Sequence, residues 1–160
     1  KSIFVGIGSS GMLGYFGGGY SIGIVVDLDT LHVGVGGTGN YGIGAGLVAP
    51  GFGVEVSLDN TLTLEEGDVH NWVVESEGSL VQMMLPIGSM SIAHDGQGNV
   101  TGGGTGFEIG TGVGAGTMAG KSHTTVLDLT AIVKAVPDAI DWAVDRFREL
   151  LRRVPHAPIL

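Results

Sequence analysis

The stretch Tyr41-Gly42-Ile43-Gly44-Ala45-Gly46-Leu47 places a glycine at every second position, between residues that are mostly large and apolar. Successive side chains of a β-strand point to opposite faces, so this spacing predicts a strand with one bulky face and one nearly bare face. Glycine is ordinarily depleted in strands because it loses much conformational entropy on folding and packs nothing. Its repeated use here predicts that something approaches the backbone closely on the bare face, or that the strands curve tightly.

The same alternation continues on both sides of this stretch. Large apolar residues recur at every second position over 20–26, 31–35, 52–58 and 107–115, and shorter apolar segments lie at 71–74, 80–85, 90–92 and 123–127. Turn signals lie at 27–30, 36–40 and 95–99. We therefore predict a mainly β fold over residues 1–127, an antiparallel sandwich or small barrel of about eight strands.

Beyond this glycine-rich domain the apolar period changes from two to that of a helix. The apolar residues of this part are spaced mostly three or four apart: Leu129, Ile132, Val133, Val136, Ile140, Ala143, Phe147, Leu150, Leu151 and Val154. We predict an amphipathic helix over 128–154, packed on or beside the β domain, where the bare glycine face offers it room. Pro137 is expected to begin or kink the main helix, and residues 155–160 form a tail. Trp142 falls on the polar side of the helix.

Charge is distributed unevenly along the 160 residues. The net charge is −9, and no Lys or Arg lies between Lys1 and Lys121, a stretch that holds eleven acidic residues. Because binding to phosphates depends on Lys and Arg, we expect no nucleic acid partner. The absence of cysteine excludes disulfides and thiolate metal sites, and no apolar run reaches the ~18 residues of a membrane-spanning helix.

Three short motifs lack the context that their chemistry requires. Gly19–Gly23 fits G-x-S-x-G, but the strand alternation continues through the serine instead of turning into a helix. Gly6–Gly11 fits G-x-G-x-x-G, but no βαβ unit follows. Asp95–Asn99 resembles part of a calcium loop, but Gly106 occupies the twelfth position, which requires Glu.

The titratable residues are scattered. Glu75 and Glu77 share one strand face, but nothing else supports glycosidase chemistry. The five histidines show no close ligand spacing, although His32 and His123 remain candidates for pairing with carboxylates in space. We therefore predict a protein that is not an enzyme and has no cofactor or metal. The competing view, an enzyme with a dispersed site, requires a deep pocket that holds two titratable groups.

Several stretches follow one another in a recognisable order. They are Gly19-Tyr20-Ser21-Ile22-Gly23-Ile24-Val25-Val26-Asp27, the run 36–46, Gly53-Val54-Glu55-Val56-Ser57, Gly110-Thr111-Gly112-Val113-Gly114-Ala115-Gly116 and 123–126. From Gly17 to Leu127 this order resembles the glycine-rich C-terminal β domains of Rhs/YD-repeat polymorphic toxins. The resemblance implies an effector that is secreted or delivered to a target cell, with a cognate immunity or carrier protein as partner. It carries over no catalytic residue and does not include the predicted helix.

A second resemblance, through Leu58–Leu64 and Val100–Gly103, is to glycine-rich outer-membrane porins of mycobacterial type.

The leading functional hypothesis is a membrane-active, pore-type effector or toxin domain. Alternating strands that are nearly free of charge can form membrane-spanning hairpins, in which each strand needs ~9–11 residues. The candidate contacts with a membrane or a partner are the large aromatic residues Trp142, Tyr20, Tyr41, Phe52 and Phe107. The alternative is a structural or binding module that self-assembles into an oligomer or filament.

The choice depends on the bulky face, which runs through Ile22, Val33, Ile43 and Val54. This face has the size to form either a core or a surface in contact with lipid.

Overall fold

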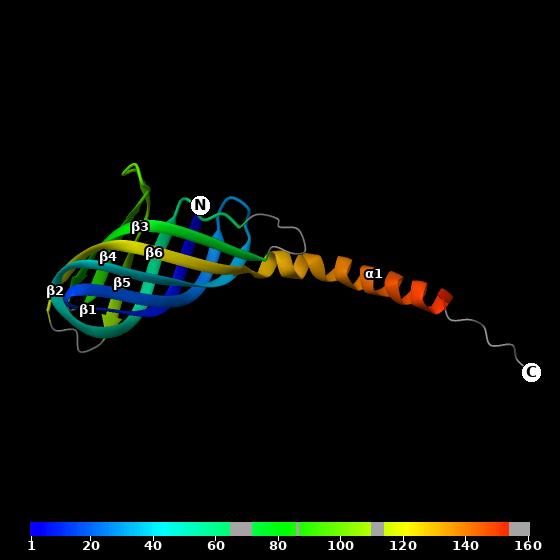
Figure 1. The fold of residues 1–160 in the computed structure, drawn as a ribbon, viewed down its shortest axis with the longest axis horizontal. Helices are drawn as coiled ribbons and strands as arrows, with labels where there is room; N and C mark the ends of the chain where they lie inside the picture. The colour runs from blue at the N-terminus through cyan, green and yellow to red at the C-terminus, as the bar shows by residue number, and fades with distance from the viewer. Residues whose placement is uncertain (65–71, 86, 110–113, 154–160) are drawn as a thin grey trace, which may run out of the picture.

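A computed structural model describes residues 1–64, 72–85, 87–109 and 114–153. Six strands precede one helix (Figure 1). Their bounds are β1 (Ser2–Asp27), β2 (Val33–Asp59), β3 (Val73–Leu85), β4 (Gly88–His94), β5 (Val100–Ile109), β6 (Gly116–Asp128) and α1 (Leu129–Arg153). The predicted tail, 155–160, lies outside the described residues.

The six strands form one antiparallel sheet that closes on itself. Their order is β1-β2-β5-β4-β3-β6, and β6 also pairs with β2. The long strand β2 makes this closure possible, because its residues 34–46 pair with β6 and its residues 52–59 pair with β5. The predicted fold class, mainly β and antiparallel in a sandwich or small barrel-like arrangement with a C-terminal helix, is confirmed.

Strands β1 and β2 are 26 and 27 residues long and pair along almost their whole length, from Ser2–Asp59 to Val26–Val33. The register shifts near Gly14, whose φ of 63° lies in the left-handed region that favours glycine. The two halves of β1 then approach each other closely. A Cβ atom added to Gly19 would lie 2.7 Å from the Ser9 carbonyl oxygen, and one added to Gly23 would overlap Gly6. Glycine is therefore needed here for close backbone approach, as the alternation predicted.

The turn or bulge predicted at 36–40 is wrong, because the pairing runs through these residues without a register shift. These residues lie inside β2 and pair with β1 on one side and β6 on the other. Glycine is a turn signal, but here it serves the strand: a Cβ on Gly36 would lie 2.5 Å from the Thr125 carbonyl oxygen. The turn at 28–30 is confirmed, and so is the turn between β4 and β5. Fewer, longer strands replace the predicted eight because apparent turns lie inside β2.

Other boundaries also differ from the prediction. Strand β1 begins at Ser2, in a segment for which the sequence predicted no strand, and β6 begins at Gly116, before the predicted 123. Of the predicted strand at 107–115, residues 107–109 belong to β5 and residues 110–113 lie outside the described ranges.

The bulky face points outward. Ile22, Val33, Ile43 and Val54 are 60%, 39%, 66% and 52% exposed. The glycine face lines the inside of the closed sheet, together with small polar residues and two apolar clusters. One cluster contains Phe4, Val25, Leu62, Leu64 and Val126, and the other contains Met12, Val48, Leu80, Met84 and Met118.

Helix α1 follows β6 directly. The Asp128 carboxylate accepts a hydrogen bond from the Ala131 backbone N–H at 2.9 Å, which caps the first turn. Beyond its first turns the helix extends away from the sheet (Figure 1), and Pro137 lies within it. The expectation that the helix lies on the glycine face is wrong, because that face is enclosed by the sheet.

Candidate functional site

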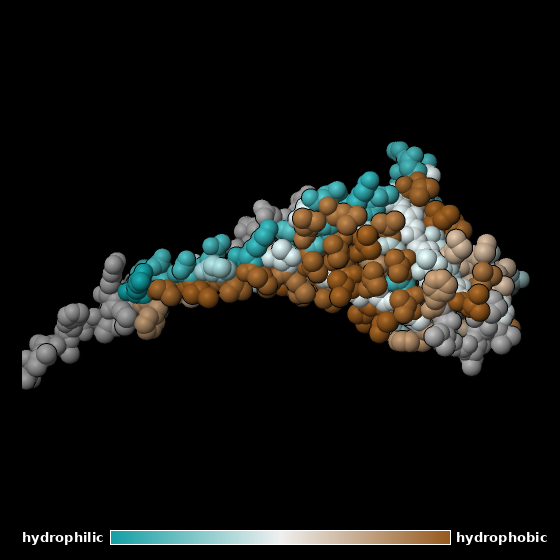
Figure 2. Space-filling view, turned by 180° about the vertical axis from the view of Figure 1, so that it is seen from behind, coloured by the Kyte–Doolittle hydropathy of each residue, from teal (hydrophilic) through white to brown (hydrophobic). Residues whose placement is uncertain are grey.

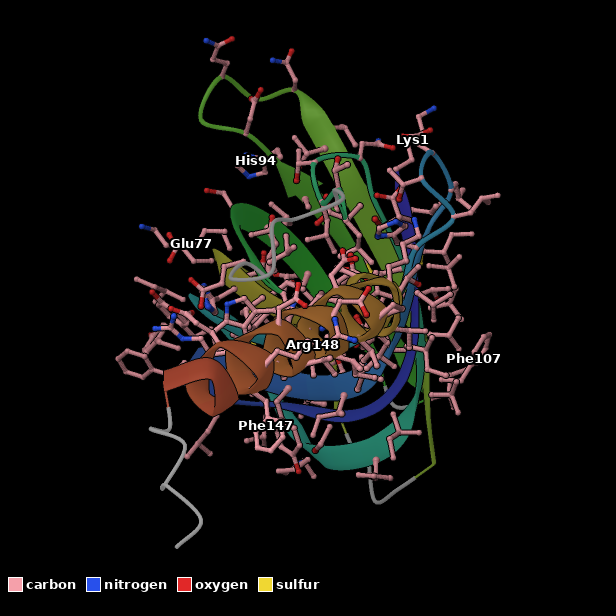
Figure 3. The ribbon with its side chains drawn as sticks, turned by 90° about the vertical axis from the view of Figure 1, so that its right-hand side faces the viewer. Lys1, Glu77, His94, Phe107, Phe147 and Arg148 are labelled. Atoms are coloured by element: carbon pink, nitrogen blue, oxygen red, sulfur yellow. The ribbon has the colours of Figure 1, made fainter. Side chains whose placement is uncertain are left out.

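The five aromatic candidates all lie on the outer surface, with exposures between 54% for Phe52 and 70% for Trp142. Two pairs are neighbours across the strand ladders. Tyr41 is opposite Gly18, two residues from Tyr20, and Phe107 is opposite Val54, two residues from Phe52. Figure 3 shows Phe107 projecting outward from the sheet. Trp142 stands apart from these pairs, on α1.

The outer face that carries these aromatics is broadly apolar. Residues 3–26 and 33–54 contain no charged side chain. Outward positions of β1 and β2 hold large apolar residues instead: Val5, Ile7, Leu13, Phe16, Ile22, Ile24, Val33, Val35, Ile43, Leu47 and Val54. Where β1 bends, an open apolar groove of about 860 Å³ is lined by residues such as Met12, Leu13, Phe16 and Leu47.

Charge on the outer face gathers on β3 and β6. Glu75 and Glu77 are exposed on β3, and Lys121 and His123 lie beside them on β6. His123 Nδ1 is 3.3 Å from a Glu77 carboxylate oxygen, an exposed contact. In Figure 2 apolar side chains cover one side of the sheet and continue along one side of α1, with hydrophilic side chains opposite. The charged side chains on β3 and β6 are not alone on their surface, because Val73, Val81 and Met83 of β3 are also exposed.

The inside of the closed sheet is small and polar between the two apolar clusters. One interior space of about 80 Å³ is lined by polar residues that include Thr38, Asn40, Glu55, Ser122 and Thr124. Asn40 and Glu55 also line a second space of about 20 Å³, together with Gln82. Gln82 is 4% exposed, and the side-chain oxygens of Asn40 and Gln82 are buried without a hydrogen-bond partner.

The segment 60–64 closes the interior at the end of the sheet where the chain begins. Leu62 and Leu64 are buried although they lie outside the strands. The Ser2 hydroxyl donates to the Leu62 carbonyl at 2.6 Å, and the Thr30 hydroxyl donates to the Leu64 carbonyl at 2.8 Å. We call residues 60–64 the plug segment.

A buried carboxylate holds the plug segment in place. Asp27 is 0% exposed and accepts hydrogen bonds from the backbone N–H groups of Leu64 at 2.6 Å, Asp29 at 2.9 Å and Thr30 at 3.3 Å. Burial alone raises the pKa of Asp27, but the three backbone donors outweigh it, so this pKa lies below its ordinary value. Asp27 is therefore ionised at neutral pH and binds the plug as an anion.

A second buried cluster joins the sheet to α1. His32 Nδ1 lies 2.7 Å from Asp128 Oδ2, and both side chains are almost completely buried. Lys134 Nζ lies 3.2 Å from His32 Nε2. Because a lysine ammonium can only donate, Nε2 of His32 is the acceptor in this contact, and Nδ1 faces the Asp128 carboxylate. With Asp128 also capping α1, the cluster fixes the start of the helix.

The two histidines left open as carboxylate partners therefore both meet carboxylates. The buried His32–Asp128 pair lies where the sheet joins α1 and contacts Lys134 of the helix. Among the residues that the structure describes, no group of three or more His, Cys, Asp or Glu side chains is placed to hold a metal ion. Within the same ranges no helix has the length and apolar character needed to cross a bilayer.

Sequence reasoning missed the plug segment, the Asp27 anchor and the interior position of Gln82. Leu62 and Leu64 gave one usable signal, because these two leucines follow the polar pair Asp59-Asn60 at a place where an exposed loop would be polar. The role of Gln82 depends on which face of β3 points inward, and alternation alone does not settle this.

Comparison with known proteins gives no further guide: no family model matches the chain, and no curated protein or solved structure matches it.

Proposed function

We propose that this domain is a non-enzymatic, membrane-active module that places the apolar side of its closed sheet in a lipid bilayer. The observation that supports this proposal is the orientation of the alternation, with large apolar side chains outside and glycine and polar side chains inside. A water-soluble closed sheet buries its bulky residues, whereas a sheet in lipid turns them outward and keeps a polar interior.

Closure of the sheet supports the same proposal. In the bilayer core no water is present to pair with backbone N–H and C=O groups, so only structures that satisfy these groups internally are stable there. The ring of pairings from β2 through β5, β4, β3 and β6 back to β2 provides such internal pairing for these five strands, whereas β1 pairs with β2 alone. Transfer of an exposed large apolar side chain out of water contributes about 1.5–3 kcal/mol.

The distribution of charge suggests how the module lies. The charged positions on β3 and β6 and the hairpin at 95–99 face water, while the β1–β2 surface faces lipid. Helix α1 has exposed apolar residues at Val133, Val136, Ile140 and Phe147, spaced as in helices that lie in the membrane interface. In Figure 3, Phe147 lies below the helix whereas Glu77 and His94 lie above it.

The polar interior favours a pore-type activity as the finer proposal. Apolar clusters close the interior at both ends, so conduction requires the plug segment to move at one end and the cluster around Met12 and Met118 to open at the other. The role as an effector, delivery to a target cell and an immunity or carrier partner rest on the resemblance to Rhs/YD-repeat toxins alone and stay predictions.

Liposomes test the proposal directly. The full chain is mixed with liposomes of neutral or anionic lipid that contain a self-quenched dye, and flotation and dye release are measured together. We expect the protein to float with the liposomes, and pore-type activity to add dye release. Protein that stays at the bottom of the gradient with every lipid contradicts membrane activity. Concentration-dependent oligomers or filaments in that case would support the alternative, a self-assembling structural module.

A further inference from the structure

The smaller interior space has the chemistry of a cation site. It is lined by Asn40, Glu55 and Gln82, and no Lys, Arg or His contributes to its lining or to that of the adjoining space. We propose that this space binds one hard cation, an alkali or alkaline-earth ion, with the Glu55 carboxylate and the side-chain oxygens of Asn40 and Gln82 as ligands. The site goes beyond the proposed membrane role and does not depend on it.

Unpaired oxygen atoms are the first argument. Gln82 is 4% exposed, and neither its Oε1 nor the buried Asn40 Oδ1 has a hydrogen-bond partner. A buried acceptor without a partner costs about 1–3 kcal/mol. An ion that accepts both oxygens as ligands removes this cost, and hard cations prefer carboxylate and amide oxygens.

Charge is the second argument. Glu55 brings a carboxylate to a wall that contains no basic side chain. Its oxygens offer a hard cation anionic ligands beside the neutral amide oxygens of Asn40 and Gln82.

Size is the third argument. The space of about 20 Å³ exceeds the ~10–15 Å³ that one water-sized particle needs. It cannot be filled by larger side chains from its glycine walls, because a Cβ on Gly19 would lie 2.7 Å from the Ser9 carbonyl oxygen and one on Gly8 would overlap the Tyr20 carbonyl oxygen. The site therefore fits a single small ion and excludes organic ligands.

Thermal unfolding of the full chain in mild detergent tests the site without any membrane. The Tm is measured in sodium chloride and in N-methyl-D-glucamine chloride at equal ionic strength, and again with added calcium chloride. A bound ion stabilises only the folded state, so we expect Tm to rise with sodium or calcium concentration. An equal Tm in all media would mean that water fills the space, and would overturn the proposal.

Two variants and a control assign the effect to these ligands. Glu55→Gln removes the charge and Gln82→Leu removes an oxygen, so each is expected to lose the cation-dependent rise in Tm. Glu75→Gln removes the same charge from an exposed position on β3 and is expected to keep the full rise. A rise that persists in both interior variants contradicts the site. Liposome flotation of Glu55→Gln, measured in parallel, separates this outcome from a failure of membrane binding.

Discussion

Single glycines set how closely the two halves of β1 approach. Gly23→Ala places a Cβ atom against the Val5 carbonyl oxygen and Gly6 Cα, which are backbone atoms that cannot rotate away. We expect this substitution to lower the free energy of unfolding by about 3 kcal/mol or more. Urea unfolding followed by circular dichroism measures the loss.

Gly39→Ala is the matched control, because nothing lies within 4 Å of the added Cβ. It makes the same glycine-to-alanine change within a strand and is expected to change the free energy of unfolding by about 0.5 kcal/mol at most. Equal effects of the two substitutions would show that conformational entropy, and not backbone approach, explains the glycines.

Asp27 makes the free energy of unfolding depend on pH in the acid range. Its pKa is lowered in the folded state, so its contribution is complete above the ordinary value of 3.8 and is lost as the pH falls below that value through the lower native pKa. At pH 7 we expect Asp27→Asn to cost about 1–3 kcal/mol, because the buried backbone donors lose an ionised acceptor.

Urea unfolding of both proteins across the acid range measures this difference, which should shrink toward zero in strong acid. Asp29→Asn removes an exposed carboxylate two residues away and should cost less than about 1 kcal/mol. A difference that stays constant with pH would contradict the role of the Asp27 anion.

Among the elements, α1 carries an apolar side that the sheet leaves uncovered. We expect the double substitution Ile140→Glu and Phe147→Glu to reduce liposome flotation at least tenfold while the thermal unfolding of the sheet is unchanged. The reason is that both side chains are exposed and belong to the side that would enter the membrane interface. Asp138→Asn and Asp141→Asn together, on exposed positions of the same helix, should preserve flotation; loss in both double variants would instead indicate damage to the helix.

The elements differ in how far the sequence predicts them. Helix α1 agrees with its prediction within one residue at each end, because an apolar period of 3.6 has no other common explanation. Too many breaks were predicted in the long strands, because Gly36–Asn40 has the composition of a turn but pairs closely with β6. The first half of β1 was missed although Val5-Gly6-Ile7-Gly8 shows the alternation, because Gly6–Gly11 also fits the G-x-G-x-x-G motif of a loop.

At the scale of the whole molecule, the sequence leaves one question that only closure of the sheet answers. A period of two assigns residues to two faces but does not say which face is inside. The ring of pairings places Gln82 and Asn40 inside and Ile43 outside, and this choice turns an apparent core into an outer surface. The interior spaces lined by Asn40 and Glu55 also follow from closure, so no local pattern of the sequence could have revealed them.

A charged side chain introduced on the outer face tests whether that face lies in lipid or in water. Ile43 is 66% exposed, so Ile43→Lys should leave stability in water within about 0.5 kcal/mol if the face is solvated. Placed in the bilayer core, the same lysine costs about 2–4 kcal/mol. We therefore expect a loss of liposome flotation of tenfold or more.

Gly96→Lys introduces the same side chain into the hairpin at 95–99, where nothing lies within 4 Å of the added Cβ. Because this hairpin lies on the polar side, flotation of Gly96→Lys should equal that of the unchanged protein. If Ile43→Lys also floats normally, the β1–β2 surface does not enter lipid. Its apolar side chains would then form contacts between copies of the chain. In that case sedimentation should show that Ile43→Lys disperses the oligomer whereas Gly96→Lys does not.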